Sequence, residues 1–307
     1  MHALEPIDLP THRPCEQPVL LITFNRPETT RQVFEAIRLA APARLYIASD
    51  GPRAGRPEEA ERVEEVRALV HEIDWPCSVQ TRFLEENRGC RLAVSSAITW
   101  FFEQEAEGII LEDDTVPNRS FFAFCECMLD RYRDDHRVYH VSGYQHLPDI
   151  PSGYDYYFSA VPGIWGWASW ADRWSTYQVD LPRLSAFDPP TLSHAAHRRY
   201  WDYTFKTVGA VDTWDYQWTY AIMRAGAVAI RPQVNLVTNI GFGADATHTT
   251  RANAEIAANV GRDIARLTRI PTTVAPAARL DYLFYKRRLR GHPLRVLYRY
   301  LHHALLR

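Results

Sequence analysis

Short apolar runs alternate with longer amphipathic runs through the first half of the chain. The apolar runs are typical of buried strands, and the longer runs repeat apolar residues at helical spacing. Pro27 begins the first of the longer runs, and proline favours the first turn of a helix. The pattern predicts strands at 18–24, 43–49, 77–85 and 107–112 and helices at 27–40, 57–73, 90–105 and 119–135. Four strand–helix units in series predict an α/β fold with a mostly parallel sheet and right-handed crossovers.

The second half of the chain is less regular and rich in aromatic residues. Four tryptophans fall within 161–177, and the last three have the spacing of a helix that begins after Trp165. Trp167, Trp170 and Trp174 would share one face of that helix, which indicates core packing. Trp165 precedes them among glycines and is the better candidate for lining a pocket. The other predicted elements are strands at 138–144 and 154–160, a helix at 212–226 and two strands followed by a glycine-rich loop within 228–249.

Polar side chains follow each of the first four predicted strands. The carboxyl ends of parallel strands meet at one edge of a sheet, and ligands of open α/β sheets bind there. Helix capping explains any single one of these residues, but it does not call for arginine at three of the four strand ends. The sequence therefore favours a ligand site at this edge. The residues are Asn25, Arg26, Asp50, Arg53, Glu86, Asn87, Arg88, Glu112, Asp113 and Asp114.

Three adjacent carboxylates, Glu112, Asp113 and Asp114, end the fourth strand. Neighbouring anions repel one another. An aspartate could cap the helix that follows, or a divalent cation could take the carboxylate oxygens. The chain lacks the glycine-rich phosphate-binding patterns GxGxxG and GxxxxGK[ST] after its first strand, so a phosphate must be held in another way. A nucleoside diphosphate carried by a divalent cation on these carboxylates is the simplest arrangement.

Composition narrows the class of protein. The chain has 307 residues and a formal net charge of -2, which is not the signature of a nucleic-acid-binding protein. Its five cysteines have no zinc-site spacing and indicate a reduced, cytosolic chain. We expect no secretory signal and no membrane span, since no apolar run approaches the roughly 20 residues that a span needs.

Residues 279–307 form a basic, amphipathic C-terminal segment with eight lysines and arginines and one acidic residue. Leu294, Leu297, Tyr298 and Leu301 fall at helical spacing. Such a segment can lie on an anionic membrane surface, here the cytoplasmic face of the plasma membrane. It can equally dock on the rest of the chain, which is acidic overall. The expected parts are an extension at 1–17, a main domain at 18–278 with halves 18–145 and 146–278, and this tail.

Six motifs, in a fixed order across roughly residues 18–250, resemble those of a known family. They are TFNRP, SDGP, EDD in place of the usual DxD, PGIWGW, WDYQW and GFGADATHT. Together they resemble the GT-A nucleotide-sugar glycosyltransferases, and among them the N-acetylglucosaminyltransferase I family and its bacterial relatives, some labelled haemolysin-like. The resemblance implies a Rossmann-like central sheet flanked by helices, with an acceptor-side C-terminal half.

The reaction that the resemblance implies is a metal-dependent, inverting transfer. A sugar, N-acetylglucosamine or another hexose, would pass from a nucleoside-diphosphate donor, most simply UDP-linked, to a hydroxyl of a glycan or lipid-linked saccharide. Asp114 would ligate Mn²⁺ or Mg²⁺, and Asp215 would be the catalytic base. Trp165 and Trp214 would line the acceptor pocket.

The resemblance also implies a set of residues that bind the donor. Arg26 and Asp50 would hold the nucleotide, with Asp50 accepting a hydrogen bond from the uracil N3–H. Asp113 would bind the ribose or the donor sugar. A loop that includes Gly241 would close over the diphosphate. The whole donor-binding set is Asn25, Arg26, Asp50, Arg88, Asp113, Gly243 and His248.

Two aspartates compete for the role of base. Asp212 lies just before the predicted helix at 212–226 and is typical of a helix N-cap. Asp215 lies in the first turn, where the helix dipole favours the ionised carboxylate that a base needs. Compensation of the dipole alone would also explain Asp215. The motif WDYQW has one aspartate where the eukaryotic enzyme has two, which leaves the acceptor open.

Two other functions fit parts of the pattern. A sugar-1-phosphate nucleotidyltransferase also uses a parallel sheet and metal-binding carboxylates. Such an enzyme normally has a glycine-rich loop with Arg or Lys directly after its first strand, and FNRPET lacks the glycines. A non-catalytic carbohydrate-binding protein could use the tryptophans, but it would not need three carboxylates at a strand end.

Overall fold

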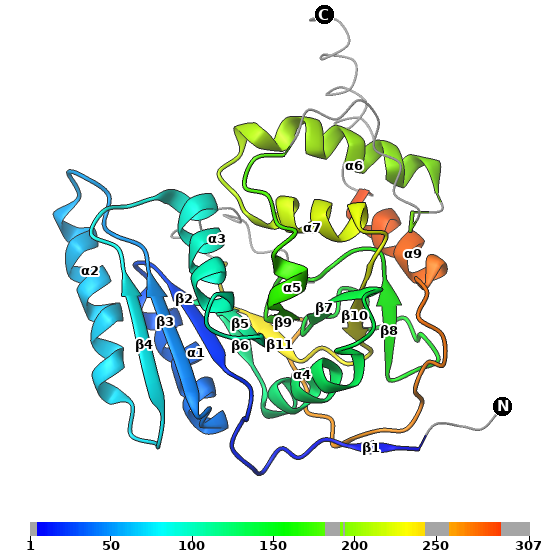
Figure 1. The fold of residues 1–307 in the computed structure, drawn as a ribbon, viewed down its shortest axis with the longest axis horizontal. Coiled ribbons are helices and arrows are strands. Elements are labelled where there is room, and N and C mark those ends of the chain that lie inside the picture. The colour runs from blue at the N-terminus through cyan, green and yellow to red at the C-terminus, as the bar shows by residue number, and fades with distance from the viewer. Residues whose placement is uncertain (1–4, 182–190, 193, 243–257, 290–307) are drawn as a thin grey trace, which may run out of the picture.

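The computed structural model describes residues 5–181, 191–192, 194–242 and 258–289. Its centre is an eight-stranded sheet with the strand order β4-β3-β2-β5-β9-β7-β10-β8 (Figure 1). The strands are β2 (Val19–Thr23), β3 (Arg44–Ser49), β4 (Ser78–Phe83), β5 (Glu107–Glu112), β7 (Val138–Ser142), β8 (Tyr156–Ser159), β9 (Trp167–Trp170) and β10 (Val228–Pro232).

Six of these strands run in one direction. The pairs β4–β3, β3–β2, β2–β5 and β7–β10 are parallel, whereas β9 is antiparallel to β5 and β7, and β8 is antiparallel to β10. The sheet is therefore mostly parallel and flanked by helices, as in a Rossmann-like GT-A-type fold. This confirms the predicted fold class.

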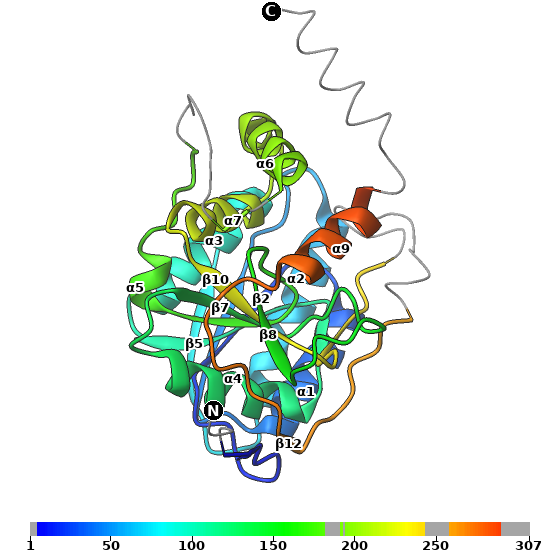
Figure 2. The same ribbon diagram turned by 90° about the vertical axis from the view of Figure 1, so that its right-hand side faces the viewer.

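Helices cover both faces of the sheet (Figures 1 and 2). Successive side chains of a strand point to opposite faces, so Leu21 of β2 packs in one core cluster and Leu20 in another. The Leu21 cluster includes residues of α1 and α4, and the Leu20 cluster includes residues of α3, α5 and α7. The helices are α1 (Pro27–Ala40), α2 (Pro57–Ala68), α3 (Gly89–Phe102), α4 (Arg119–Tyr132), α5 (Ala171–Trp174), α6 (Ala195–Thr207), α7 (Asp215–Arg224) and α9 (Ala278–Leu289).

Smaller elements complete the described part of the chain. β6 (Thr115–Pro117) and β11 (Val237–Asn239) form a short antiparallel pair directly after the carboxylate triplet. β1 (Ile7–Asp8) pairs with β12 (Arg266–Leu267). Two 3₁₀ helices, Leu69–Glu72 and Val208–Ala210, follow α2 and α6.

The helix predicted for the stretch from Trp167 to Trp174 is wrong over its first half. Residues 167–170 form β9, and only Ala171–Trp174 are helical. In a strand, residues three apart point to opposite faces, so Trp167 joins the α3/α7 cluster while Trp170 joins the α1/α4 cluster. The tryptophans are core residues, but they reach the core on two sides of the sheet. Pairing of this segment between β5 and β7 decides its conformation, and no local pattern shows that pairing.

Both ends of the described chain pack on the central domain. Leu9 and Cys15 of the predicted N-terminal extension are buried. At the other end, α9 covers part of the predicted tail, and Leu280 and Tyr285 are buried against the domain. The amphipathic stripe that begins at Leu294 lies outside the described residues. Within the described ranges, the structure has no helix of the length and apolarity that a membrane crossing requires.

Candidate functional site

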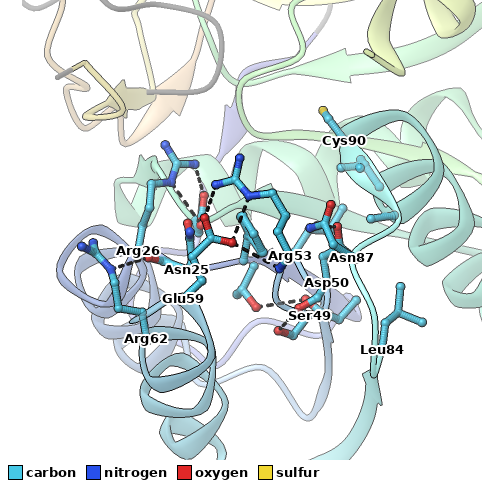
Figure 3. A pocket seen from close by; sticks show the side chains of 18 of the residues that line it. Asn25, Arg26, Ser49, Asp50, Arg53, Glu59, Arg62, Leu84, Asn87 and Cys90 are labelled. Carbon is cyan, nitrogen blue, oxygen red and sulfur yellow. Dashed lines mark hydrogen bonds and ion pairs between the residues drawn. The ribbon is translucent and has the colours of Figure 1, made fainter. Parts of the chain in front are cut away.

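A cavity of about 590 Å³ opens where β2, β3 and β4 end. Its lining includes most of the polar residues that the sequence places at this edge of the sheet. In Figure 3, Arg26 and Arg53 extend from neighbouring loops into the same space, with Asn87 beside Asp50. Arg53 donates from Nε to Glu59 Oε2 at 2.9 Å. The structure therefore brings residues from three loops into one polar cavity.

Asp50 organises one side of this first cavity. Its Oδ1 accepts the backbone N–H groups of Gly51 and Arg88, both at 2.9 Å, and its Oδ2 accepts Asn87 Nδ2–H at 2.9 Å. Burial raises the pKa of Asp50, although the backbone N–H groups of Arg88 and Gly51 lower it. A carboxylate oxygen has two acceptor positions, so Oδ2 can take a further N–H from a ligand. Arg88 contributes its backbone here, and its side chain is not part of the lining of this cavity.

Arg26 balances two of the three adjacent carboxylates. Its Nη2 bonds to Asp113 Oδ1, its Nε donates to Asp113 Oδ2 at 3.3 Å, and its Nη1 donates to Asp114 Oδ2 at 2.9 Å. Burial opposes the charge of Arg26, but the two aspartates outweigh burial and raise the pKa of the guanidinium. The family resemblance implies that Arg26 holds the nucleotide. In the structure its guanidinium lines the cavity and is paired with these two carboxylates.

Neither aspartate of the triplet caps the following helix. The N-cap of α4 is Asn118, whose side chain accepts the backbone N–H of Phe121 at 2.9 Å. The strand β6 separates this cap from the triplet. The capping explanation for the three carboxylates is therefore wrong.

The carboxylate triplet carries more negative charge than its one paired arginine, Arg26, can balance. Burial raises the pKa of Glu112 well above its usual value, and the charges of Asp114, Asp113 and Asp215 raise it further. Four carboxyl groups thus share the neighbourhood of one guanidinium. An excess of carboxylate oxygens suits a hard divalent cation such as Mn²⁺ or Mg²⁺. Among the described residues, no three His, Cys, Asp or Glu side chains are arranged so that they could hold a metal ion together. Such a cation would therefore need further oxygens from a ligand or water.

A second cavity of about 520 Å³ has a wall with many aromatic side chains. Trp165 lies in this wall and packs edge-on against Tyr144, with ring centroids 4.5 Å apart. Trp214 also lies in the wall, but it is only 2% exposed and stacks on Trp167 in the core. The aromatic residues of the wall are Tyr144, His146, Trp165, Trp201, Trp214, Tyr216, Phe242 and Phe284.

The two cavities meet at the carboxylate triplet. Arg26, Cys90 and Glu112 line both of them, whereas Asp113 lines only the first and Asp114 only the second. A ligand that extends from one cavity to the other must therefore pass the three carboxylates.

Asp215 is the first residue of α7, and it lines the second cavity. The hydroxyl of Thr213 donates to Asp215 Oδ1. This hydrogen bond orients the carboxyl group. The other oxygen, Oδ2, can then accept a hydrogen bond from a ligand.

Asp212 is a helix cap, but of a different helix from the one predicted. Its two oxygens accept the backbone N–H groups of Cys90, at 2.9 Å, and Arg91, at 2.8 Å, in the first turn of α3. Gly89 has a φ of +76°, and a Cβ there would lie 2.6 Å from Asp212 Oδ2. Asp212 therefore ties the loop before α7 to a segment that lies about 120 residues earlier in the chain.

We expect the substitution Asp212→Asn to lower the free energy of unfolding by about 1 kcal/mol. The reason is that the amide has one acceptor oxygen where the carboxylate uses two, and its NH₂ group would face a backbone N–H. Denaturant unfolding measures the effect. Asp180→Asn is the control, since the side chain of Asp180 is 92% exposed, and it should leave stability unchanged. Equal stability of the two variants would contradict the capping role.

The loop after β11 begins against Asp114. The N–H of Ile240 donates to the backbone oxygen of Asp114 at 2.8 Å. A Cβ on Gly241 would lie 2.1 Å from Asp114 Oδ2, so only glycine leaves room for this carboxylate. Gly243 and His248, which the sequence assigns to the same loop, lie outside the described residues.

Several residues of the second cavity are not evident from the sequence. Tyr144 and His146 follow β7, so the strand-end argument used for the first four strands would have found them. Trp201 of α6 and Phe284 of α9 have no local signal, because they reach the cavity only through the packing of their helices.

The comparisons with known proteins identify no family. No family model and no curated protein matches the chain. Among solved structures, a UDP-glucose pyrophosphorylase in complex with UDP-glucose aligns with 10% sequence identity and a TM-score of 0.37. The alignment covers 70% of this chain and 90% of that one. A likeness this weak says nothing about reaction or ligand, so the functional argument rests on the residues of the site.

Proposed function

We propose that this protein is a glycosyltransferase that moves a hexosyl group from a nucleoside-diphosphate donor, UDP-linked in the simplest case, to a hydroxyl of a saccharide. The observation that carries the proposal is the meeting of two chemically different cavities at the carboxylate triplet. The first cavity, with its charged strand-end residues, suits a nucleotide. The second, with its aromatic wall, suits the apolar faces of sugar rings.

In this proposal the donor lies along the strand ends. Asp50 Oδ2 accepts the N–H of the base, and Asn25, Arg26 and Arg88 lie on the loops that surround the nucleotide. Asp113 contacts the ribose or the donor sugar, and Gly243 and His248 are proposed as further residues that bind the diphosphate. Asp114, at the junction of the cavities, would hold Mn²⁺ or Mg²⁺, which would stabilise the charge of the leaving diphosphate.

Asp215 acts as the general base on the acceptor side. Thr213 orients one of its oxygens, and Asp215 is the first residue of α7. The free oxygen takes the proton of the acceptor hydroxyl as that hydroxyl attacks the anomeric carbon. A single in-line displacement with one base inverts the configuration at that carbon.

The charge of the second cavity favours transfer to a saccharide over nucleotidyl transfer. A nucleotidyltransferase must hold the phosphate of a sugar 1-phosphate, which calls for a lysine or arginine. Arg26 is the sole lysine or arginine among the described residues that line the second cavity, and it is already paired with Asp113 and Asp114. A neutral acceptor sugar meets no such difficulty. A purely carbohydrate-binding protein would have no use for the buried carboxylates.

Calorimetry and a product assay test the proposal together. We expect UDP to bind the protein in the presence of Mn²⁺ and more weakly in EDTA. Incubation with UDP-hexoses and a panel of neutral mono- and disaccharides should release UDP. Pyrophosphate-dependent release of UTP from a UDP-hexose would instead identify a nucleotidyltransferase. Absence of any UDP binding would reject both enzymes.

Binding of the C-terminal segment to a membrane is a separate proposal. Because α9 packs on the domain, the predicted contact with an anionic membrane surface now concerns residues 290–307. A truncation that tests it should end after Leu289 rather than at Ala278, since Tyr285 is fully buried.

A further inference from the structure

The segment between β8 and β9 forms part of the wall of the second cavity without having regular secondary structure. Val161, Pro162, Ile164 and Trp165 all line that cavity. Irregular backbone is not held by a continuous ladder of its own hydrogen bonds, so side chains from elsewhere must fix its position.

Two buried charged side chains bind the beginning of this segment. Arg231 of β10 donates from Nε and Nη2 to the backbone oxygen of Val161, at 2.9 and 2.7 Å. Asp281 of α9 accepts the backbone N–H of Ala160 at 2.9 Å and the hydroxyl of Ser159 at 2.6 Å. Arg231 is 2% exposed and Asp281 is 7% exposed.

A fold gains little stability from charges placed in this way. Burial lowers the pKa of Arg231 and raises the pKa of Asp281, because it disfavours the charged form of each, although the two charges favour one another. Buried charges are weak stabilisers, and one attested use is to specify a single arrangement of the groups around them. The group that both of these charges hold is the wall of the second cavity.

The helix α9 also contributes to the wall directly. Phe284 lines the second cavity, its ring lies 4.8 Å from that of His146, and the guanidinium of Arg231 lies 5.7 Å from its centroid. Tyr285 accepts the indole N–H of Trp201, another wall residue. Figure 2 shows α9 next to β8, which leads into the wall segment.

We propose that Asp281 and Arg231 are positioning residues for acceptor binding, and that α9 is therefore part of the acceptor side of the enzyme. The part of this proposal that concerns the acceptor rests on the proposed function. The claim that these two side chains fix the position of the wall does not depend on that function.

Hydrogen exchange of the intact protein tests the placement. We expect Asp281→Asn to speed amide exchange at Ala160 and Val161 by roughly tenfold or more, while exchange in β2 and β3 and the Kd for UDP stay unchanged. Arg231→Lys keeps the charge but loses the two-pronged contact, and it should have the same local effect. Lys286→Gln, on the exposed side of α9, is the control and should change nothing.

Steady-state kinetics then test the link to function. With an acceptor found in the UDP-release assay, Asp281→Asn should raise the KM for that acceptor by roughly tenfold and leave the KM for the UDP-hexose unchanged. Unchanged exchange at Ala160 and Val161, or an equal rise throughout the protein, would overturn the proposal. If the protein releases no UDP, the exchange measurement alone decides whether these residues place the wall.

Discussion

Replacement of Asp215 by asparagine is expected to lower the rate of sugar transfer by about 10²–10⁴ while UDP binding is retained. The amide keeps the shape of the side chain and the hydrogen bond from Thr213, but it cannot take a proton. The donor is expected to bind as before, because Asp215 lines only the second cavity. Turnover of a UDP-hexose with its acceptor and calorimetry with UDP measure the two effects separately.

Asp212→Asn is the matched control for this experiment. The same chemical change three residues earlier weakens a cap of α3, at a residue that lines the first cavity but not the second. The folded Asp212→Asn protein should keep most of its activity. If the two variants lost activity equally, or if only Asp212→Asn did, Asp215 would not be the base.

Replacement of Asp114 by alanine is expected to weaken Mn²⁺-dependent UDP binding by at least about 100-fold. The change removes the carboxylate that lies where the two cavities meet. It also frees Nη1 of Arg26, which bonds to Asp114 at 2.9 Å, so some metal-independent UDP binding should persist. Calorimetry with UDP in Mn²⁺ and in EDTA separates the two components.

Two further variants sharpen this prediction. Gly241→Ala should cause a smaller loss of the same kind, because its methyl group would displace the Asp114 carboxylate. Asp74→Ala removes an aspartate that is also paired with an arginine, but on the surface away from both cavities, and it should bind UDP normally. An unchanged Mn²⁺ requirement in Asp114→Ala would show that the metal, if one binds, is held elsewhere.

The elements of the first half of the fold could be predicted from local sequence patterns. Most strands there are apolar runs, and each helix repeats apolar residues at helical spacing. The helix at Pro27–Ala40 has the predicted bounds, because a proline marks its first residue and its apolar residues keep helical spacing up to Ala40. Most strands of this half are likewise recognised from their own apolar runs. The segment at 161–177 is different, because its tryptophan spacing suits either a helix or a strand and only pairing with β5 and β7 decides between them.

The sequence by itself determined that polar residues would gather at one edge of a parallel sheet, because strand direction places every strand end on the same side. It also identified Asp215 and the carboxylate triplet as the chemical groups of interest. Tertiary structure alone decided how these groups are balanced and joined. Arg26 reaches Asp113 and Asp114 from 87 and 88 residues away, and Asp212 caps a helix 121 and 122 residues away. Such contacts depend on how helices pack on the sheet, and residue spacing along the chain carries no record of that packing.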